Sequence, residues 1–171
     1  MRYWTLPAAI GAAIMISSTS SASPSHGVIS GIYNRDSESR DTAFQAIESA
    51  IAAVPDAKRP RARMILRKSI AVSIIRISST GDRLSITYDA KAPIVVWIGG
   101  EPIKWTLIEG LIFDVSAKAN DEAVSLKFHG DDSERTTVYR SVGQQLVEET
   151  TIISPLLSTP IRYRLTYSRA K

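Results

Sequence analysis

The chain has 171 residues, 44% of them hydrophobic, and no cysteine, which excludes a disulfide-stapled module and a thiolate zinc site. This length fits one domain that can bury a substantial core. The formal net charge is +4, but the excess is local, because residues 56–68 hold six basic side chains against one acidic one. A local excess indicates a contact surface, and it argues against a general nucleic-acid-binding protein.

Residues 1–22 have the layout of a signal peptide. A basic residue precedes the apolar run "TLPAAIGAAIMI", and Ser20 and Ala22 suit cleavage after Ala22. Pro7 and Gly11 interrupt the run, which is also shorter than the about 20 apolar residues that span a bilayer. We therefore expect an exported protein, periplasmic or extracellular, with no transmembrane span after the signal is removed.

The next segments differ in periodicity. Residues 23–38 show none and contain proline and glycine, so they are interpreted as a flexible leader with room for one short strand. Residues 39–54 repeat apolar side chains at steps of three and four, which predicts an amphipathic helix capped near Ser39 or Asp41 and stopped by Pro55. The basic run after the proline has the composition of a second short helix.

From residue 70 onward, β-branched and aromatic residues form short runs separated by turn residues. Strands are predicted near residues 70–78, 83–89, 93–98, 102–106, 111–118, 122–129, 134–141, 145–153 and 160–168. The connections are short, so neighbouring strands should be antiparallel and joined as hairpins.

These elements define the predicted fold class. It is mainly β, an antiparallel up-and-down meander of about nine strands that forms a barrel or a strongly curled sheet. One N-terminal amphipathic helix accompanies the strands, and residues 39–171 make a single domain. Apolar and polar residues alternate in most strands, so each should have one buried and one exposed face.

The C-terminal part runs from a polar strand, "ERTTVYRSV", to a tyrosine-rich last strand, "IRYRLTYSR". With the signal-peptide layout and the long meander over residues 70–171, the chain resembles lipocalin-like (calycin) exported β-barrels. It also resembles uncharacterised exported bacterial β-meander proteins. The glycine-x-tryptophan signature of lipocalins is absent, and the helix precedes the strands. The resemblance implies a barrel that holds a small apolar molecule.

Aromatic residues are the candidate ligand contacts. Two tryptophans flank the glycine-rich turn "IGGEPIK" and could form the rim of a ligand mouth, while tyrosine hydroxyls could orient a polar head group. The candidates are Trp97, Trp105, Phe113, Phe128, Tyr139, Tyr163 and Tyr167. The same residues could instead fill a packed core, because the interior of a barrel of about eight strands is just wide enough for side chains.

A second candidate site is the basic segment, defined as residues 58–68. Its charged residues are Lys58, Arg59, Arg61, Arg63, Arg67 and Lys68. They could contact an anionic envelope component or an acidic protein. The alternative is an ordinary solvated helix face.

The remaining polar motifs favour structural roles. Residues 129–135, "HGDDSER", combine histidine with carboxylates, but they have no calcium-loop spacing and fit a hairpin turn better than a metal site. Arg135 and Arg140 on one strand with Glu148 and Glu149 on the next predict cross-strand ion pairs, or a polar catalytic patch as the more ambitious alternative.

Known catalytic and nucleotide-binding motifs are missing from the sequence. There is no nucleophile elbow, phosphate loop or dinucleotide fingerprint, so no cofactor and no metal are predicted. Basic and aromatic residues do not interleave on a strand as single-strand nucleic-acid binders require. The sequence therefore favours an exported non-enzymatic binding protein for a small apolar or amphipathic ligand. The alternative is a structural or partner-docking envelope protein that uses the basic segment.

Overall fold

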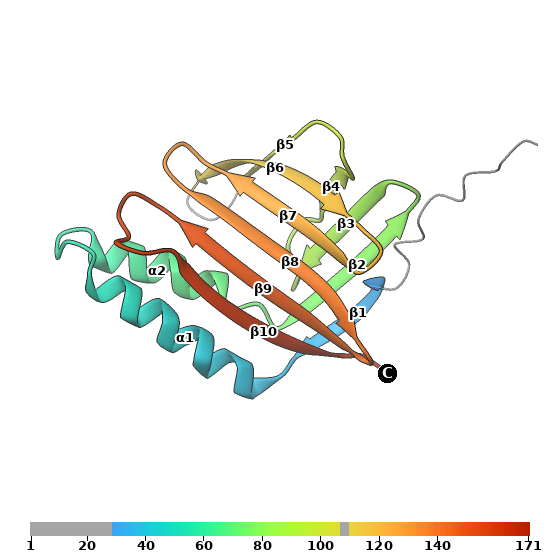
Figure 1. Ribbon diagram of the computed structural model, residues 1–171, viewed down its shortest axis with the longest axis horizontal. Coiled ribbons are helices and arrows are strands. Elements are labelled where there is room, and N and C mark those ends of the chain that lie inside the picture. The colour runs from blue at the N-terminus through green and yellow to red at the C-terminus, as the bar shows by residue number, and fades with distance from the viewer. Residues whose placement is uncertain (1–28, 107–109) are drawn as a thin grey trace, which may run out of the picture.

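The computed structural model describes residues 29–106 and 110–171, so the predicted signal peptide lies outside the described residues. Within these ranges the chain forms one ten-stranded antiparallel sheet, curled into a nearly closed barrel, and two helices (Figure 1). The first elements are β1 (Gly31–Arg35), α1 (Ser37–Ala52), α2 (Arg59–Ser69), β2 (Ile74–Thr80), β3 (Arg83–Tyr88) and β4 (Ile94–Trp97). The others are β5 (Ile103–Thr106), β6 (Ile112–Ala119), β7 (Ala123–His129), β8 (Glu134–Val142), β9 (Gln145–Ile153) and β10 (Ile161–Arg169).

The strand order is β4-β3-β2-β1-β10-β9-β8-β7-β6-β5, so the first and last strands of the chain are neighbours. The two ends of this order approach each other where Ile98 forms a single bridge with Ala117 of β6. The amide of Gly99 also donates a 2.9 Å hydrogen bond to the carbonyl of Ala117. The sheet therefore closes on itself except along the seam between β4 and β5.

The predicted fold class is confirmed: the protein is mainly β, antiparallel and barrel-like. Each predicted strand has an observed counterpart, and β1, which lies inside the predicted leader, is the additional one. The basic segment forms α2, so the described part of the chain has two helices, whereas the predicted fold class contained one.

One predicted hairpin is wrong. The turn "GGEP" does not pair the strands on either side of it, because β4 and β5 lie at opposite ends of the strand order. Gly99 adopts a φ of 72° and its amide binds β6, which directs the chain away from β4. Pro102 has no N–H to offer to a ladder with β4.

Helix α1 packs against β10 because its small and branched residues lie on one face. Ala43, Ile47 and Ile51 are buried and four residues apart, so they form one stripe along the helix. Figure 1 shows α1 and α2 side by side next to the β10 edge of the visible face. The helices thus cover part of the barrel with an apolar contact.

The predicted start of α1 is wrong by about one turn. The N-cap is Asp36, whose ψ of 133° is extended, and the helix begins immediately after β1. Ser39 does not act as the cap because its hydroxyl serves another contact: it accepts a 3.1 Å hydrogen bond from the amide of Thr166 in β10 and donates to the carbonyl of Asp36. The serine therefore ties the first turn of the helix to the sheet.

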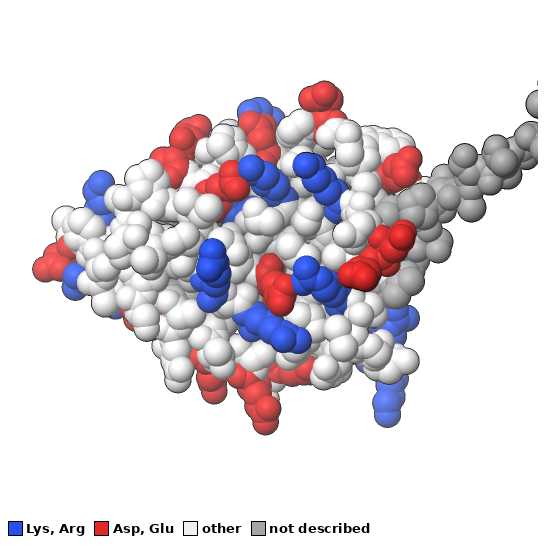
Figure 2. Space-filling view, viewed as in Figure 1, with Lys and Arg blue, Asp and Glu red and all other residues white. Residues whose placement is uncertain are grey.

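The inner faces of the strands form the core. In β10, Ile161, Tyr163, Leu165 and Tyr167 are buried, whereas the arginines between them are exposed. Positive and negative side chains are intermingled over the outer surface of this side of the molecule (Figure 2). In the described part of the chain, neither helix has the length and apolar character needed to cross a membrane.

Substituting Ile47→Ala should lower the free energy of unfolding by about 2–5 kcal/mol, because it removes a fully buried side chain and leaves a cavity between α1 and β10. Urea denaturation measures this change. Gln45→Ala on the exposed face of the same helix is the control and should have little effect. Equal stabilities of the two variants would contradict the packing of α1 on the barrel.

Candidate functional site

The barrel interior contains six of the seven aromatic residues that the sequence singled out. Phe128, Tyr139, Tyr163 and Tyr167 are buried on the inner faces of β7, β8 and β10. Trp105 of β5 and Phe113 of β6 are partly buried and pack against the same core. The Trp105 and Phe128 rings meet edge to face, with their centroids 5.9 Å apart.

Trp97 does not join this set. It lies on the outer face of β4, where 59% of its surface is exposed, because its neighbour Val96 takes the inward position. Its Cβ packs under Gly100, where an added Cβ would come within 2.7 Å of it. The two tryptophans around the glycine-rich turn therefore do not form a common rim.

A polar cluster, defined as Arg135, Thr137, Glu148, Thr150 and Tyr167, lies on the inner faces of β8, β9 and β10. The guanidinium of Arg135 donates from Nε to the Thr137 hydroxyl at 3.0 Å and from Nη2 to Glu148 Oε1 at 3.3 Å. Thr137 and Thr150 share a 3.0 Å hydrogen bond, and Thr150 donates to Glu148 Oε1 at 3.0 Å. The Tyr167 hydroxyl donates to Glu148 Oε2 at 3.0 Å. The result is a closed ring of hydrogen bonds around one ion pair.

Other tyrosines extend the polar character of the interior. The hydroxyls of Tyr88 and Tyr139 share a 2.7 Å hydrogen bond, and the Tyr163 hydroxyl lies 3.4 Å from that of Ser69 in α2. Burial raises the pKa of Tyr88, Tyr139, Tyr163 and Tyr167, and the negative charge of Glu148 adds to the rise. These phenols therefore stay protonated and can act as hydrogen-bond donors.

Arg135 is the more accessible partner of the buried ion pair. Its side chain retains 20% exposure, against 3% for Glu148, although both point inward. Its Nη1 makes no hydrogen bond to any described residue, yet no buried side-chain nitrogen or oxygen in the described ranges lacks a partner. Nη1 therefore keeps some surface that water can reach.

The sequence interpretation named Arg135 and Glu148 as members of cross-strand ion pairs or of a polar catalytic patch, and it did not place these two residues in the interior. That pair is confirmed, as is the pair of Arg140 with Glu149. The missed signal is the alternation in β9, where Glu148 and a threonine occupy inward positions between Leu146 and Ile152. Polar residues that interrupt an apolar face on adjacent strands indicate an interior polar site.

Three of the six basic residues of the basic segment make contacts that join α2 to the end and the side of α1. Arg63 and Arg67 of α2 both bind the carboxylate of Glu48 in α1, at 3.1 and 2.8 Å. The hydrogen bond from Arg67 is the largest cause of the lowered pKa of Glu48. Arg59 pairs with Asp56 and donates to the carbonyls of Val54 and Ala52 at the end of α1.

The other charged residues of the segment, Lys58, Arg61 and Lys68, are exposed. Docking of this surface to an anionic envelope component or to an acidic protein stays a prediction.

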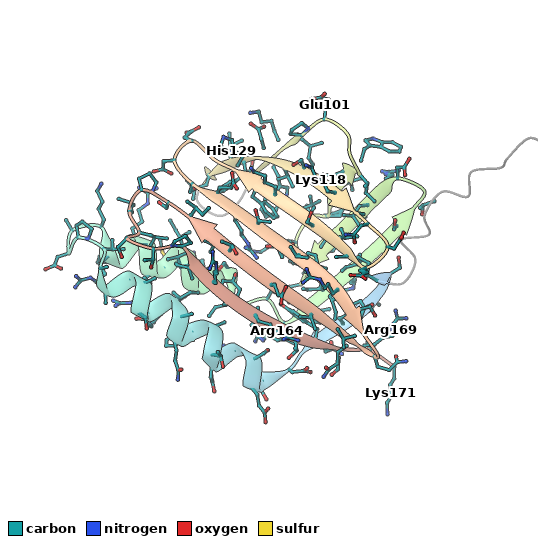
Figure 3. All side chains as sticks on the ribbon, in the orientation of Figure 1. Glu101, Lys118, His129, Arg164, Arg169 and Lys171 are labelled. Carbon is teal, nitrogen blue, oxygen red and sulfur yellow. The ribbon has the colours of Figure 1, made fainter. Side chains whose placement is uncertain are left out.

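The motif "HGDDSER" forms the β7–β8 turn as predicted, with the amide of Gly130 donating to the Ser133 carbonyl at 2.8 Å. Across residues 29–106 and 110–171, no three or more His, Asp or Glu side chains gather as a metal site would require. His129 sits at the end of β7, at the margin of the sheet (Figure 3).

Comparisons with known proteins identify the fold. No protein-family model matches the chain, and no curated protein matches it. Among solved structures, a Schistosoma mansoni fatty acid binding protein in complex with arachidonic acid is 14% identical, with a TM-score of 0.58, over 88% of this chain and 100% of that one. A zebrafish ileal bile acid-binding protein complexed with cholic acid is 16% identical, with a TM-score of 0.54, over 84% and 99%.

A secretary abundant heat soluble protein from Ramazzottius varieornatus is also similar, with 10% identity and a TM-score of 0.60 over 84% of this chain and 96% of that one. The resemblance to lipocalin-like barrels is confirmed at the level of the fold. At these identities the likeness establishes architecture alone, because one fold can carry unrelated functions.

Raising the pH above about 10 should destabilise the protein through its buried tyrosines. Their pKa values are raised in the folded state above the ordinary value of 10.0, so the unfolded chain loses these protons first. The stability that they contribute is complete below that value and is lost as the pH rises further. Free energies of unfolding at about pH 8 and about pH 11 measure the loss, which Tyr88→Phe should reduce. Full phenolate absorbance of the folded protein near pH 10 would contradict the prediction.

Proposed function

We propose that the protein binds a small apolar or amphipathic molecule inside its barrel and that it acts without catalysis. The observation that carries this proposal is the unpartnered, accessible Nη1 of Arg135 in an interior lined mostly by apolar and aromatic side chains. Sites for small molecules combine mostly apolar walls with a few polar groups that orient the guest. The tyrosines and Leu126 supply the walls, and Arg135 supplies a donor.

Proteins of the same architecture support this proposal. Two of the similar structures are described as complexes with arachidonic acid and with cholic acid, each an amphipathic molecule with a large apolar part. The inner faces of this chain have the same kind of surface: buried Leu, Ile, Val and aromatic side chains surround one polar cluster. A guest would place its apolar part along those walls and its polar end beside Arg135.

Native mass spectrometry of the gently purified protein should show an additional mass that is lost on denaturation. Tyr163→Trp should reduce guest occupancy several-fold, because a larger ring at this buried inner position takes up interior volume. Arg164→Trp is the matched control. It should leave occupancy unchanged, because Arg164 is the next residue in β10 and points to the outside of the barrel (Figure 3).

A bare polypeptide mass, both as purified and after incubation with lipid extract, would overturn the proposed function. The tyrosine-lined face would then be a packed core. Equal occupancy in the Tyr163→Trp and Arg164→Trp variants would place any bound guest outside the barrel.

We also propose that residues 1–22 direct export and are removed after Ala22. The support is the order of a basic residue, an apolar run and small residues before the cleavage position. The intact mass of the protein recovered from the medium or the periplasm should correspond to residues 23–171. Recovery of the full chain, confined to the cytoplasm, would contradict this.

A further inference from the structure

Both oxygens of the Glu148 carboxylate are already engaged by the protein. Oε1 accepts hydrogen bonds from Arg135 and Thr150, and Oε2 accepts one from Tyr167. Glu148 is 2% exposed, so a guest has almost no access to it. Its role at this site is to supply a fixed negative charge beside the guanidinium.

Arg135, in contrast, is only partly occupied. Nε and Nη2 are engaged with Thr137 and Glu148, and Nη1 is not bonded within the described ranges. A guest that approaches Nη1 meets a hydrogen-bond donor whose positive charge is compensated 3.3 Å away by a buried carboxylate. The phenols of Tyr88 and Tyr139 form a neutral, hydrogen-bonded pair in the same interior.

The charge balance decides which head group fits. A carboxylate guest would place two negative charges around one positive charge in a poorly solvated interior, and like charges that share a buried site disfavour each other. A hydroxyl, carbonyl or amide oxygen can accept from Nη1 without adding charge. We propose that the barrel selects an uncharged amphipathic guest with a hydrogen-bond-accepting head group and discriminates against carboxylates. This inference rests on the proposed function, because it specifies the guest class of the same interior.

The proposal separates this chain from the structural neighbours that are described with acids bound. A fatty acid binding protein and a bile acid-binding protein share its architecture, and their described guests, arachidonic acid and cholic acid, are both acids. In this barrel the negative partner of Arg135 is built into β9 as Glu148. The positive charge of Arg135, which an acid guest would neutralise, is therefore already compensated by Glu148.

The test compares two probes of equal chain length, decan-1-ol and decanoate, by isothermal titration calorimetry on the purified full chain at neutral pH. Decanol should bind at least about tenfold more tightly than decanoate. Glu148→Gln keeps the size of the side chain and an acceptor for Tyr167 while it removes the negative charge. This variant should gain affinity for decanoate on the order of tenfold, so the ratio of decanol affinity to decanoate affinity should fall towards one.

Glu149→Gln is the matched control. Glu149 is the next residue in β9, points outward and pairs with Arg140, so its neutralisation should change neither affinity.

Three outcomes separate the two proposals. Decanoate binding as tightly as decanol to the unmodified protein would overturn the head-group inference and leave the interior site standing, and this comparison does not depend on whether a variant folds. An unchanged ratio in folded Glu148→Gln would overturn the role of Glu148. Absence of binding by both probes to the unmodified protein and to both variants would overturn the proposed function itself.

Discussion

The pairing of β1 with β10 is the interaction on which the barrel depends. Three residue pairs, from Tyr33 with Arg169 to Arg35 with Tyr167, join strands from opposite ends of the described chain, and the other edge of β1 pairs with β2. Arg169 reinforces the junction by lying over the Tyr33 ring and donating to the Ser30 carbonyl. A Cβ on Gly31 would come within 3.2 Å of that guanidinium, so the absence of a side chain lets Arg169 lie across β1. Without this closure the sheet would have two more exposed edges and no enclosed inner face.

Closure of the barrel creates an interior in which burying a charged group is unfavourable. The polar cluster shows how the fold compensates for this desolvation. Transferring an arginine and a glutamate from water costs several kcal/mol for each ion, which their attraction offsets only when further hydrogen bonds satisfy them. Thr137, Thr150 and Tyr167 supply such bonds. Apolar residues of similar size would often be equally stabilising, so a buried ion pair is weak support for a purely structural role. A head-group site explains better why the interior keeps the pair, because it uses the donor that the protein leaves open.

The sequence predicted the strands well because their alternation is a local property. In β10, for example, every second residue from Ile161 to Tyr167 is apolar and buried. It could not predict the β4–β5 seam, since the partner of Gly99 is Ala117, which is distant in sequence. The start of α1 was also misplaced, because Ser39 binds the amide of Thr166. In β8, "ERTTVYRSV", apolar and polar residues alternate only weakly. The pattern alone therefore did not decide whether Arg135 faces the inside or the outside of the sheet.

Arginines on the surface and in the interior are paired with acidic residues of the same chain. The basic segment suggests an anion-binding surface when read as sequence, but Glu48 holds two of its arginines and Asp56 holds a third. Inside the barrel Glu148 compensates Arg135 in the same way. In both places an acidic residue of the chain itself takes the position that an external anion would need. Three arginines of the basic segment are therefore engaged within the chain. A guest of the proposed interior site would be recognised by shape, by apolar contact and by hydrogen bonding to a neutral group.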